Sequence, residues 1–295
     1  MHNRAVAYFR TLQDEICDAL AKIDGGAGFR EDSWDRPGGG GGRSRVIENG
    51  AVFEKGGVNF SEVFGEMEPK FAAQLPGDGN SFTATGLSLV IHPRSPHIPT
   101  VHMNYRFLTK GTKSWFGGGA DLTPYYPVKE DVVHFHQTLK AVCDKHAQIA
   151  NYSKMKSDCD EYFHIAHRNE ARGVGGIFFD YLEGDLEQTF AFVQDAGRAF
   201  LDAYLPIVNR RKGQSCIDPQ RAFQEYRRGR YVEFNLIYDR GTLFGLKTAG
   251  RIESILMSLP PVVRYIYDFK PEPGSPEAAL TEYWLQPRDW VNEIL

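Results

Sequence analysis

The sequence predicts an α+β protein, a single domain over residues 1–295 that is built on a large, mainly antiparallel β-sheet flanked by helices on both faces. Residues 82–92 and 100–108 alternate apolar and other side chains with the period of a strand, and a proline-rich turn joins them. Asn49–Gly50 lies between apolar pairs, which is typical of a tight hairpin. Other segments repeat apolar residues every three or four positions, as amphipathic helices do. Strands that return through hairpins and helices favour this architecture.

Composition excludes several classes of function. A net charge of −4 and the lack of a dense basic stretch argue against nucleic-acid binding. No run of about 18 apolar residues is present, so no membrane span is expected. The four cysteines are scattered without a Cys-x-x-Cys pair, which argues against a zinc ribbon or an iron–sulfur cluster and indicates reduced thiols. Without the pattern of a signal or transit peptide, a cytoplasmic protein is expected.

The N-terminal part begins with an amphipathic pattern that predicts a helix over residues 3–23. Residues 35–45 contain five consecutive glycines and are expected to form a flexible loop, with a lid over an anionic ligand as the alternative. They lack the Lys-Ser/Thr of a phosphate-binding loop. Residues 46–53 then predict the hairpin.

The two central runs carry the candidate site. In residues 100–108 the parity of a strand places Val101, Met103, Tyr105 and Phe107 on one face. If the runs pair, their other faces form one polar surface, although a polar face is also typical of the solvated side of an antiparallel sheet. The residues that would share that surface are Ser88, His92, His102, Asn104 and Arg106.

Glycines 117–119 follow two aromatic residues and indicate a close approach of backbone to a neighbour or ligand. Helices are predicted over 129–147, with His136 at the edge of the buried stripe, and over about 153–172, with His167 on its flank. Residues 173–180 read as a buried strand.

The C-terminal part predicts a long helix over 185–204 and a polar helical stretch that continues to about 228. Residues 230–239 alternate again and predict a strand. A short helix that ends at Pro260, a strand over 262–269 and a helix from about Pro276 complete the chain.

The residues alone leave the chemistry open between several classes. Three histidines from different elements are compatible with a metal site, but they lack a short ligand motif such as His-Glu-x-x-His. Serine, histidine and aspartate are all present, but Ser88 lies in mid-strand without a Gly-x-Ser-x-Gly elbow, which disfavours a hydrolase triad.

Long motifs in the chain resemble one known family. They include Gly86-Leu-Ser-Leu-Val-Ile-His-Pro-Arg-Ser-Pro, Pro99-Thr-Val-His-Met-Asn-Tyr-Arg-Phe, Trp115-Phe-Gly-Gly-Gly-Ala-Asp-Leu-Thr-Pro, His167-Arg-Asn-Glu-Ala-Arg-Gly and Asp239-Arg-Gly-Thr-Leu-Phe-Gly-Leu. These motifs are similar to those of the oxygen-dependent coproporphyrinogen III oxidases of haem synthesis, from about residue 5 onward. The other enzyme type for this step, a radical S-adenosylmethionine protein, would need a Cys-x-x-x-Cys-x-x-Cys cluster, which this chain lacks.

The resemblance implies oxidative decarboxylation of two propionates of coproporphyrinogen III to vinyl groups, giving protoporphyrinogen IX, with O₂ as co-substrate and no organic cofactor. It implies a homodimer, with residues of about 231–266 tied to dimerisation. By resemblance His102 is the proton donor, and the substrate-binding residues are Ser88, Asn104, Tyr105, Arg106, Ala249, Gly250 and Arg251. Ala249 departs from the expected Gly-Gly-Arg.

Porphyrinogen chemistry suggests further roles. The four pyrrole N–H groups need an acceptor, and Asp239 is a natural one, so we place it with His102 among the catalytic residues. The propionates call for arginines. Bacterial relatives imply a divalent metal at the histidines matching His92, His136 and His167, where softness favours zinc, copper or iron. A metal-dependent oxygenase or hydrolase and a non-catalytic tetrapyrrole carrier remain the alternatives.

Overall fold

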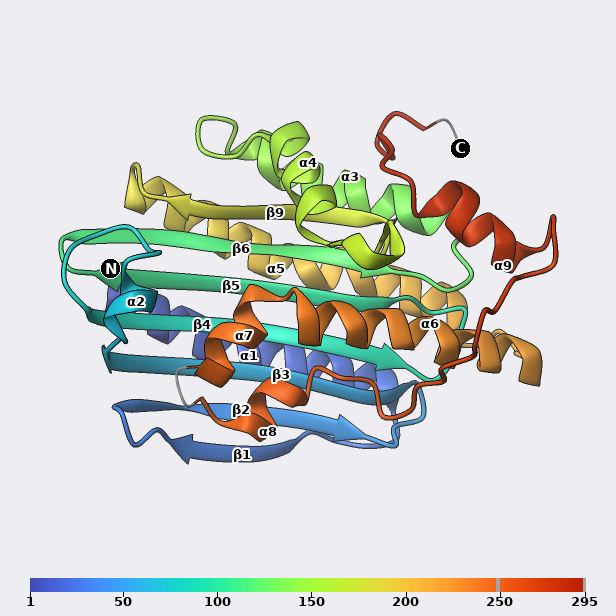
Figure 1. Ribbon diagram of the computed structural model, residues 1–295, viewed down its shortest axis with the longest axis horizontal. Helices are drawn as coiled ribbons and strands as arrows, with labels where there is room; N and C mark the ends of the chain where they lie inside the picture. The colour runs from blue at the N-terminus through green and yellow to red at the C-terminus, as the bar shows by residue number, and fades with distance from the viewer. Residues whose placement is uncertain (248–249, 294–295) are drawn as a thin grey trace.

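A computed structural model describes residues 1–247 and 250–293. Its centre is one seven-stranded sheet in which every pair of neighbours is antiparallel, in the order β1-β2-β3-β4-β5-β6-β9 (Figure 1). The predicted α+β class is therefore confirmed. The strands are β1 (Arg30–Asp35), β2 (Gly40–Glu48), β3 (Phe53–Glu66), β4 (Ser81–Pro93), β5 (Thr100–Lys110), β6 (Lys113–Thr123) and β9 (Gly175–Leu182).

Helices cover both faces of the sheet (Figure 1). One face carries α1 (His2–Asp24), α3 (Lys129–Lys145) and α5 (Leu186–Arg211). The other carries α6 (Asp218–Ile237), α7 (Arg240–Lys247) and α8 (Ile252–Leu256). The smaller elements are α2 (Pro69–Ala72), α4 (Tyr152–Tyr162) along the edge strand β9, the short hairpin β7 (His164–Ile165) with β8 (Glu170–Ala171), and α9 (Pro276–Ala279).

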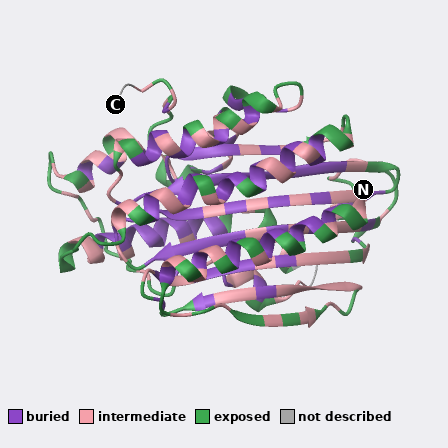
Figure 2. Ribbon diagram, turned by 180° about the vertical axis from the view of Figure 1, so that it is seen from behind, coloured by how far each residue is buried: buried purple, intermediate pink, exposed green. Residues whose placement is uncertain are grey.

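The core lies between the sheet and α1, α3 and α5. Alternate residues of β4 and β5, from Leu87 to Ile91 and from Val101 to Phe107, are at most 2% exposed, as their parity predicts. Figure 2 shows the matching pattern on the helices behind the sheet, which bury one side and expose the other. Because one face of β4 and β5 is fixed by the core, their remaining side chains must point to the opposite face.

Most of the glycine-rich segment is strand, so the loop predicted over residues 35–45 is wrong except at residues 36–39, which form the turn between β1 and β2. Gly40 to Gly42 belong to β2, which pairs with both β1 and β3. A Cβ on Gly41 would lie 2.2 Å from the Trp34 carbonyl oxygen, and one on Gly42 would lie 2.3 Å from the Trp34 ring. The close approach of Trp34 therefore accounts for Gly41 and Gly42.

The predicted strand over 230–239 is also wrong, because α6 runs unbroken from Asp218 to Ile237. This helix is buried on several sides, including at Tyr231, Glu233 and Asn235. When little of a helix faces solvent, its apolar residues follow no clear helical period. The alternation of residues 230–239 therefore resembled that of a strand by chance.

One predicted helix is shorter than expected, and one predicted strand does not form. The helix predicted over 153–172 ends at Tyr162, and Asn169 takes a left-handed backbone with φ 52° before β8. Residues 262–269 form no strand, and the side chains of Val262, Tyr265 and Tyr267 are exposed. The remaining predicted helices are confirmed, including the short helix α8 and the C-terminal α9. Among the described residues, no helix has both the length and the apolar character for crossing a membrane.

Candidate functional site

A cavity of about 590 Å³ lies between the polar face of the sheet and the helices that cover it. Its floor is formed by β3, β4, β5 and β6, and its walls by α6, α7 and α8 together with Phe71 of α2 and Tyr162 at the end of α4. Pockets of this size are typical of small-molecule sites. The cavity lies directly over the residues that the central strands were predicted to present.

The register of β4 and β5 brings most of those residues together. Ser88 is opposite Asn104, and Arg106 lies two positions along the same face. Together with His102 they line the cavity, whereas His92, the fifth residue expected on this surface, does not. Tyr105 has the opposite parity and its ring is fully buried in the core, so the structure does not bring its side chain to the cavity.

His102 is held by the buried carboxylate of Asp121, a residue to which the sequence patterns assigned no role. β6 places Asp121 opposite His102, and the His102 Nδ1 atom lies 2.8 Å from Asp121 Oδ1. Burial alone would raise the pKa of Asp121, but the Arg172 guanidinium and the His102 hydrogen bond outweigh it and lower that pKa. A deprotonated carboxylate only accepts, so Nδ1 donates and Nε2 is left without a protein partner among the described residues.

Arg172 is the second residue that sequence reasoning missed. Its NH2 group donates to both oxygens of Asp121 at 2.8 Å, and its NH1 group donates to Asn235 at 3.1 Å. The guanidinium lies 3.9 Å from the centre of the Phe163 ring, and its side chain is 2% exposed. A buried charge of this kind requires a partner, and Asp121 provides it. His102, Asp121 and Arg172 form one network at the cavity floor, and His102 and Arg172 line the cavity.

Two arginines meet one carboxylate at the edge of the cavity. Arg106 forms an ion pair with Asp180 at 2.8 Å, while Arg240 lies 3.8 Å from the same carboxylate. Arg240 also lies over the Tyr162 ring, 4.7 Å from its centre. Two cations that share one anion leave positive charge for an anionic ligand.

Asp239 lines the cavity at the junction of α6 and α7. It accepts a hydrogen bond from the Tyr162 hydroxyl at 3.0 Å and another from the backbone N–H of Thr242 at 2.7 Å. Burial, with the charge of Asp239 as a second cause, raises the pKa of Tyr162 to about 12, so this hydroxyl stays protonated and donates. The carboxylate is therefore fixed in place.

Gly250 and Arg251, the described residues of the third predicted substrate-binding stretch, do not line the cavity. The backbone N–H of Gly250 donates to the Gly245 carbonyl at 2.8 Å, which closes the turn after α7. Arg251 is paired with Asp32 on β1. Ala249 lies outside the described residues.

The three histidines of the hypothesised metal site do not form a common ligand set. His92 contacts the Thr100 hydroxyl and the Ser258 carbonyl, and His136 contacts the Tyr152 hydroxyl and the Val174 carbonyl. His167 contacts Tyr238 and Glu233. Within residues 1–247 and 250–293, no group of three or more His, Cys, Asp or Glu side chains could hold a metal ion.

The hydrogen bonds of these histidines, and not their charge, argue against a ligand role, because a neutral imidazole is the form that binds metals. Burial lowers the pKa of His136 to about 3, with Lys156 as the second cause, so its ring is neutral. Both ring nitrogens of each histidine already have hydrogen-bond partners, which a metal would have to displace. The arrangement does not fit a metal centre.

A comparison with known protein families matches most of the chain. Residues 4–290 match the family model described as coproporphyrinogen III oxidase. The match covers the sheet, the cavity and all of the helices that surround it.

Proposed function

The chain belongs to the coproporphyrinogen III oxidase family, an oxidoreductase family of haem biosynthesis with a porphyrinogen substrate, and on that premise we propose that it is the O₂-dependent enzyme. The proposed reaction converts two propionates of coproporphyrinogen III to vinyl groups and gives protoporphyrinogen IX. In each step the propionate loses CO₂ and the equivalent of a hydride. O₂ accepts the two electrons and, with two protons, leaves as H₂O₂.

The observation that carries this proposal is the His102–Asp121 pair on the cavity floor. The fixed Nδ1–H···Asp121 hydrogen bond directs Nε2 away from the carboxylate, as a proton-transferring histidine requires. A proton must be delivered for each molecule of O₂ reduced, and His102 is the group proposed to exchange it.

The rest of the cavity supports a flat anionic macrocycle. Asp239 is proposed to accept hydrogen bonds from the pyrrole N–H groups, because its position is fixed by Tyr162 and Thr242. Arg106 is proposed to bind a propionate in place of Asp180. Ser88 and Asn104 also line the cavity and are proposed to supply further polar contacts to the substrate.

O₂ dependence rests on the cysteines and on the substrate. Three cysteines, Cys17, Cys143 and Cys159, are buried, and Cys216 is exposed. All four lie well apart in the sequence. This spacing lacks the cluster motif of a radical S-adenosylmethionine enzyme. Reduced pyrroles are electron-rich and can react with O₂ directly, so no organic cofactor is proposed and the protein supplies proton transfer and exclusion of water.

A homodimer is part of the proposal. Large apolar side chains are exposed from the end of α6 onward, a region that overlaps residues 231–266, and exposed apolar surface often marks an interface. They are Leu236, Ile237, Leu246, Ile252, Val262, Tyr265, Ile266 and Tyr267. Sedimentation at several protein concentrations tests this, and a monomer at all of them contradicts it.

The function is tested by adding coproporphyrinogen III to the chelator-treated protein without oxygen, then admitting air and identifying the porphyrins by chromatography. Protoporphyrin that appears only after air is the expected result. Product formed without oxygen would contradict the O₂ dependence. Binding of substrate without any product would favour the tetrapyrrole carrier.

A further inference from the structure

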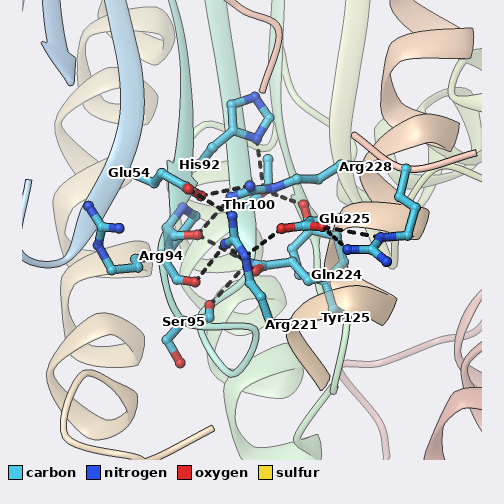
Figure 3. Close-up of polar contacts among 12 residues, drawn as sticks. Glu54, His92, Arg94, Ser95, Thr100, Tyr125, Arg221, Gln224, Glu225 and Arg228 are labelled. Atoms are coloured by element: carbon cyan, nitrogen blue, oxygen red, sulfur yellow. Dashed lines mark hydrogen bonds and ion pairs between the residues drawn. The ribbon is translucent and has the colours of Figure 1, made fainter. Parts of the chain in front are cut away.

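His92 lies near the end of β4, on the same face of the strand as the cavity-lining Ser88 and Val90. Its side chain is fully buried. Figure 3 shows the ring above a cluster of polar side chains, with a contact to Thr100. The ring also packs edge-on against Tyr231, 5.2 Å between centres, and Tyr231 forms part of the cavity wall.

The hydrogen bonds determine the tautomer of His92. Its Nε2 lies 2.8 Å from the carbonyl oxygen of Ser258, which can only accept, so Nε2 carries the proton. Burial and then the charge of Arg228 lower the pKa of His92 well below its usual value, so the ring is neutral and Nδ1 accepts. The Thr100 hydroxyl donates to Nδ1 at 3.2 Å and must therefore accept from the Tyr125 hydroxyl at 2.8 Å.

Helices α6 and α8 both cover the polar face of the sheet and are called the cover. They are attached to the sheet in different ways. α6 is anchored by a separate polar cluster, in which Arg228 pairs with Glu54 at 2.7 Å and donates to the Pro93 carbonyl at 2.9 Å (Figure 3). Gln224 donates to the same carbonyl at 3.0 Å. The segment after α8 has the hydrogen bond from His92 to Ser258, which attaches it to the end of β4.

We propose that His92 is a positioning residue for the porphyrinogen, which holds the α8 wall of the cavity against the sheet, and that it is not a metal ligand. This proposal rests on the proposed function and deepens it. Met257 and Ser258 line the cavity immediately beside the bonded carbonyl. Without the bond, the Ser258 carbonyl loses its donor. The wall is then held less firmly, by the Ser44–Ser254 hydroxyl contact at 2.7 Å and the Arg251–Asp32 ion pair at the other end of α8.

Such a role affects binding more than chemistry. His92 does not line the cavity, and the His102–Asp121 pair is held by β5, β6 and Arg172. Removal of the His92 donor is therefore expected to raise KM for coproporphyrinogen III about tenfold while kcat changes little. A metal ligand essential to the reaction would instead lower kcat.

The test compares His92→Leu with His92→Gln. The glutamine amide can place an N–H near the position of Nε2, but an amide is a poor ligand for zinc or copper. His92→Gln is expected to restore KM to within about threefold of wild type, whereas His92→Leu is not. His134→Leu, on the outer side of α3 with its ring at the Asp202 carbonyl, is the matched control and should change neither constant.

Two further measurements keep the result independent of folding and of turnover. Circular dichroism selects folded variants, and fluorescence titration with coproporphyrin III, the stable oxidised tetracarboxylate, gives a Kd without turnover. A wild type that binds but does not turn over refutes the proposed function, while the Kd series still tests His92. Equal Kd values in wild type and His92→Leu, or one zinc or manganese ion bound by wild type and lost in His92→Gln, would overturn the proposal.

Discussion

Asp121→Asn tests the reasoning about the site most directly. The substitution keeps the shape of the side chain but removes the charge that faces His102 and Arg172 at 2.8 Å. An asparagine amide can donate to Nδ1 and so select the other tautomer, and loss of a histidine's carboxylate partner reduces serine-protease turnover about 10⁴-fold. Because general acid–base catalysis supplies about 10²–10⁴, we expect kcat to fall by at least about 10².

The same change has a cost in stability that decides how the assay is done. Arg172 is almost fully buried, and breaking a buried ion pair costs about 3–5 kcal/mol. This is a large part of the total stability of about 5–15 kcal/mol that is usual for a protein. The variant should therefore be assayed at low temperature, after its folded fraction has been measured by urea unfolding.

A matched control separates catalysis from stability. Asp131 on α3 is also a buried carboxylate and accepts from two arginines, Arg210 at 2.9 Å and Arg211 at 2.6 Å. Asp131→Asn should lose stability but retain kcat. In a His102→Ala background, Asp121→Asn should lower stability without a further loss of activity. Wild-type kcat in folded Asp121→Asn would refute the role given to the pair.

Three other predictions follow from the same contacts. Asp239→Asn should weaken coproporphyrin III binding or turnover without unfolding, because only the charge changes, and unchanged kinetics would remove Asp239 from the site. Exhaustive treatment with a chelator should leave activity intact, because the histidines already use their ring nitrogens in hydrogen bonds; loss of activity that divalent metal restores would contradict this. The third concerns Glu233, where burial is outweighed by Arg168 and His167 and the pKa is lowered from 4.5 to about 2. Its stabilisation is complete above pH 4.5 and is lost as pH falls towards 2, so the stability difference between wild type and Glu233→Gln should shrink over that range; a difference independent of pH would exclude the ion pairs as its source.

Local patterns predicted the part of the site that lies within one hairpin. Ser88, Asn104 and Arg106 were found because strand parity is local and the prolines limited the connection between the strands. Asp121 and Arg172 were missed because their roles depend on contacts between elements. Asp121 becomes a partner of His102 only through the register of β5 and β6. The glycines before it indicated that close pairing but not the partner.

The hypothesised metal site also shows that sequence patterns do not identify contacts between distant elements. Histidines in separate elements suggested convergence, but their distribution in the sequence contains no information about their partners. Each ring instead contacts nearby hydroxyl, carbonyl or carboxylate groups. α6 was misread as a strand near its end because buried polar residues such as Glu233 and Asn235 obscure the helical period.

The floor and the cover of the cavity are held in place differently, and this predicts whether a substitution changes mainly kcat or mainly KM. The floor consists of strands whose other face is locked in the core, and Gly118 lets β5 approach so closely that a Cβ there would lie 2.4 Å from the Asn104 carbonyl oxygen. The cover is attached by side-chain hydrogen bonds, such as that from His92 to Ser258. The rigid floor carries His102, so substitutions there should act mainly on kcat, whereas those in the cover should act mainly on KM. Gly118→Ala distinguishes the two effects, because it adds no polar group yet must separate β5 from β6, and a normal kcat in this variant would show that the reaction tolerates a displaced floor.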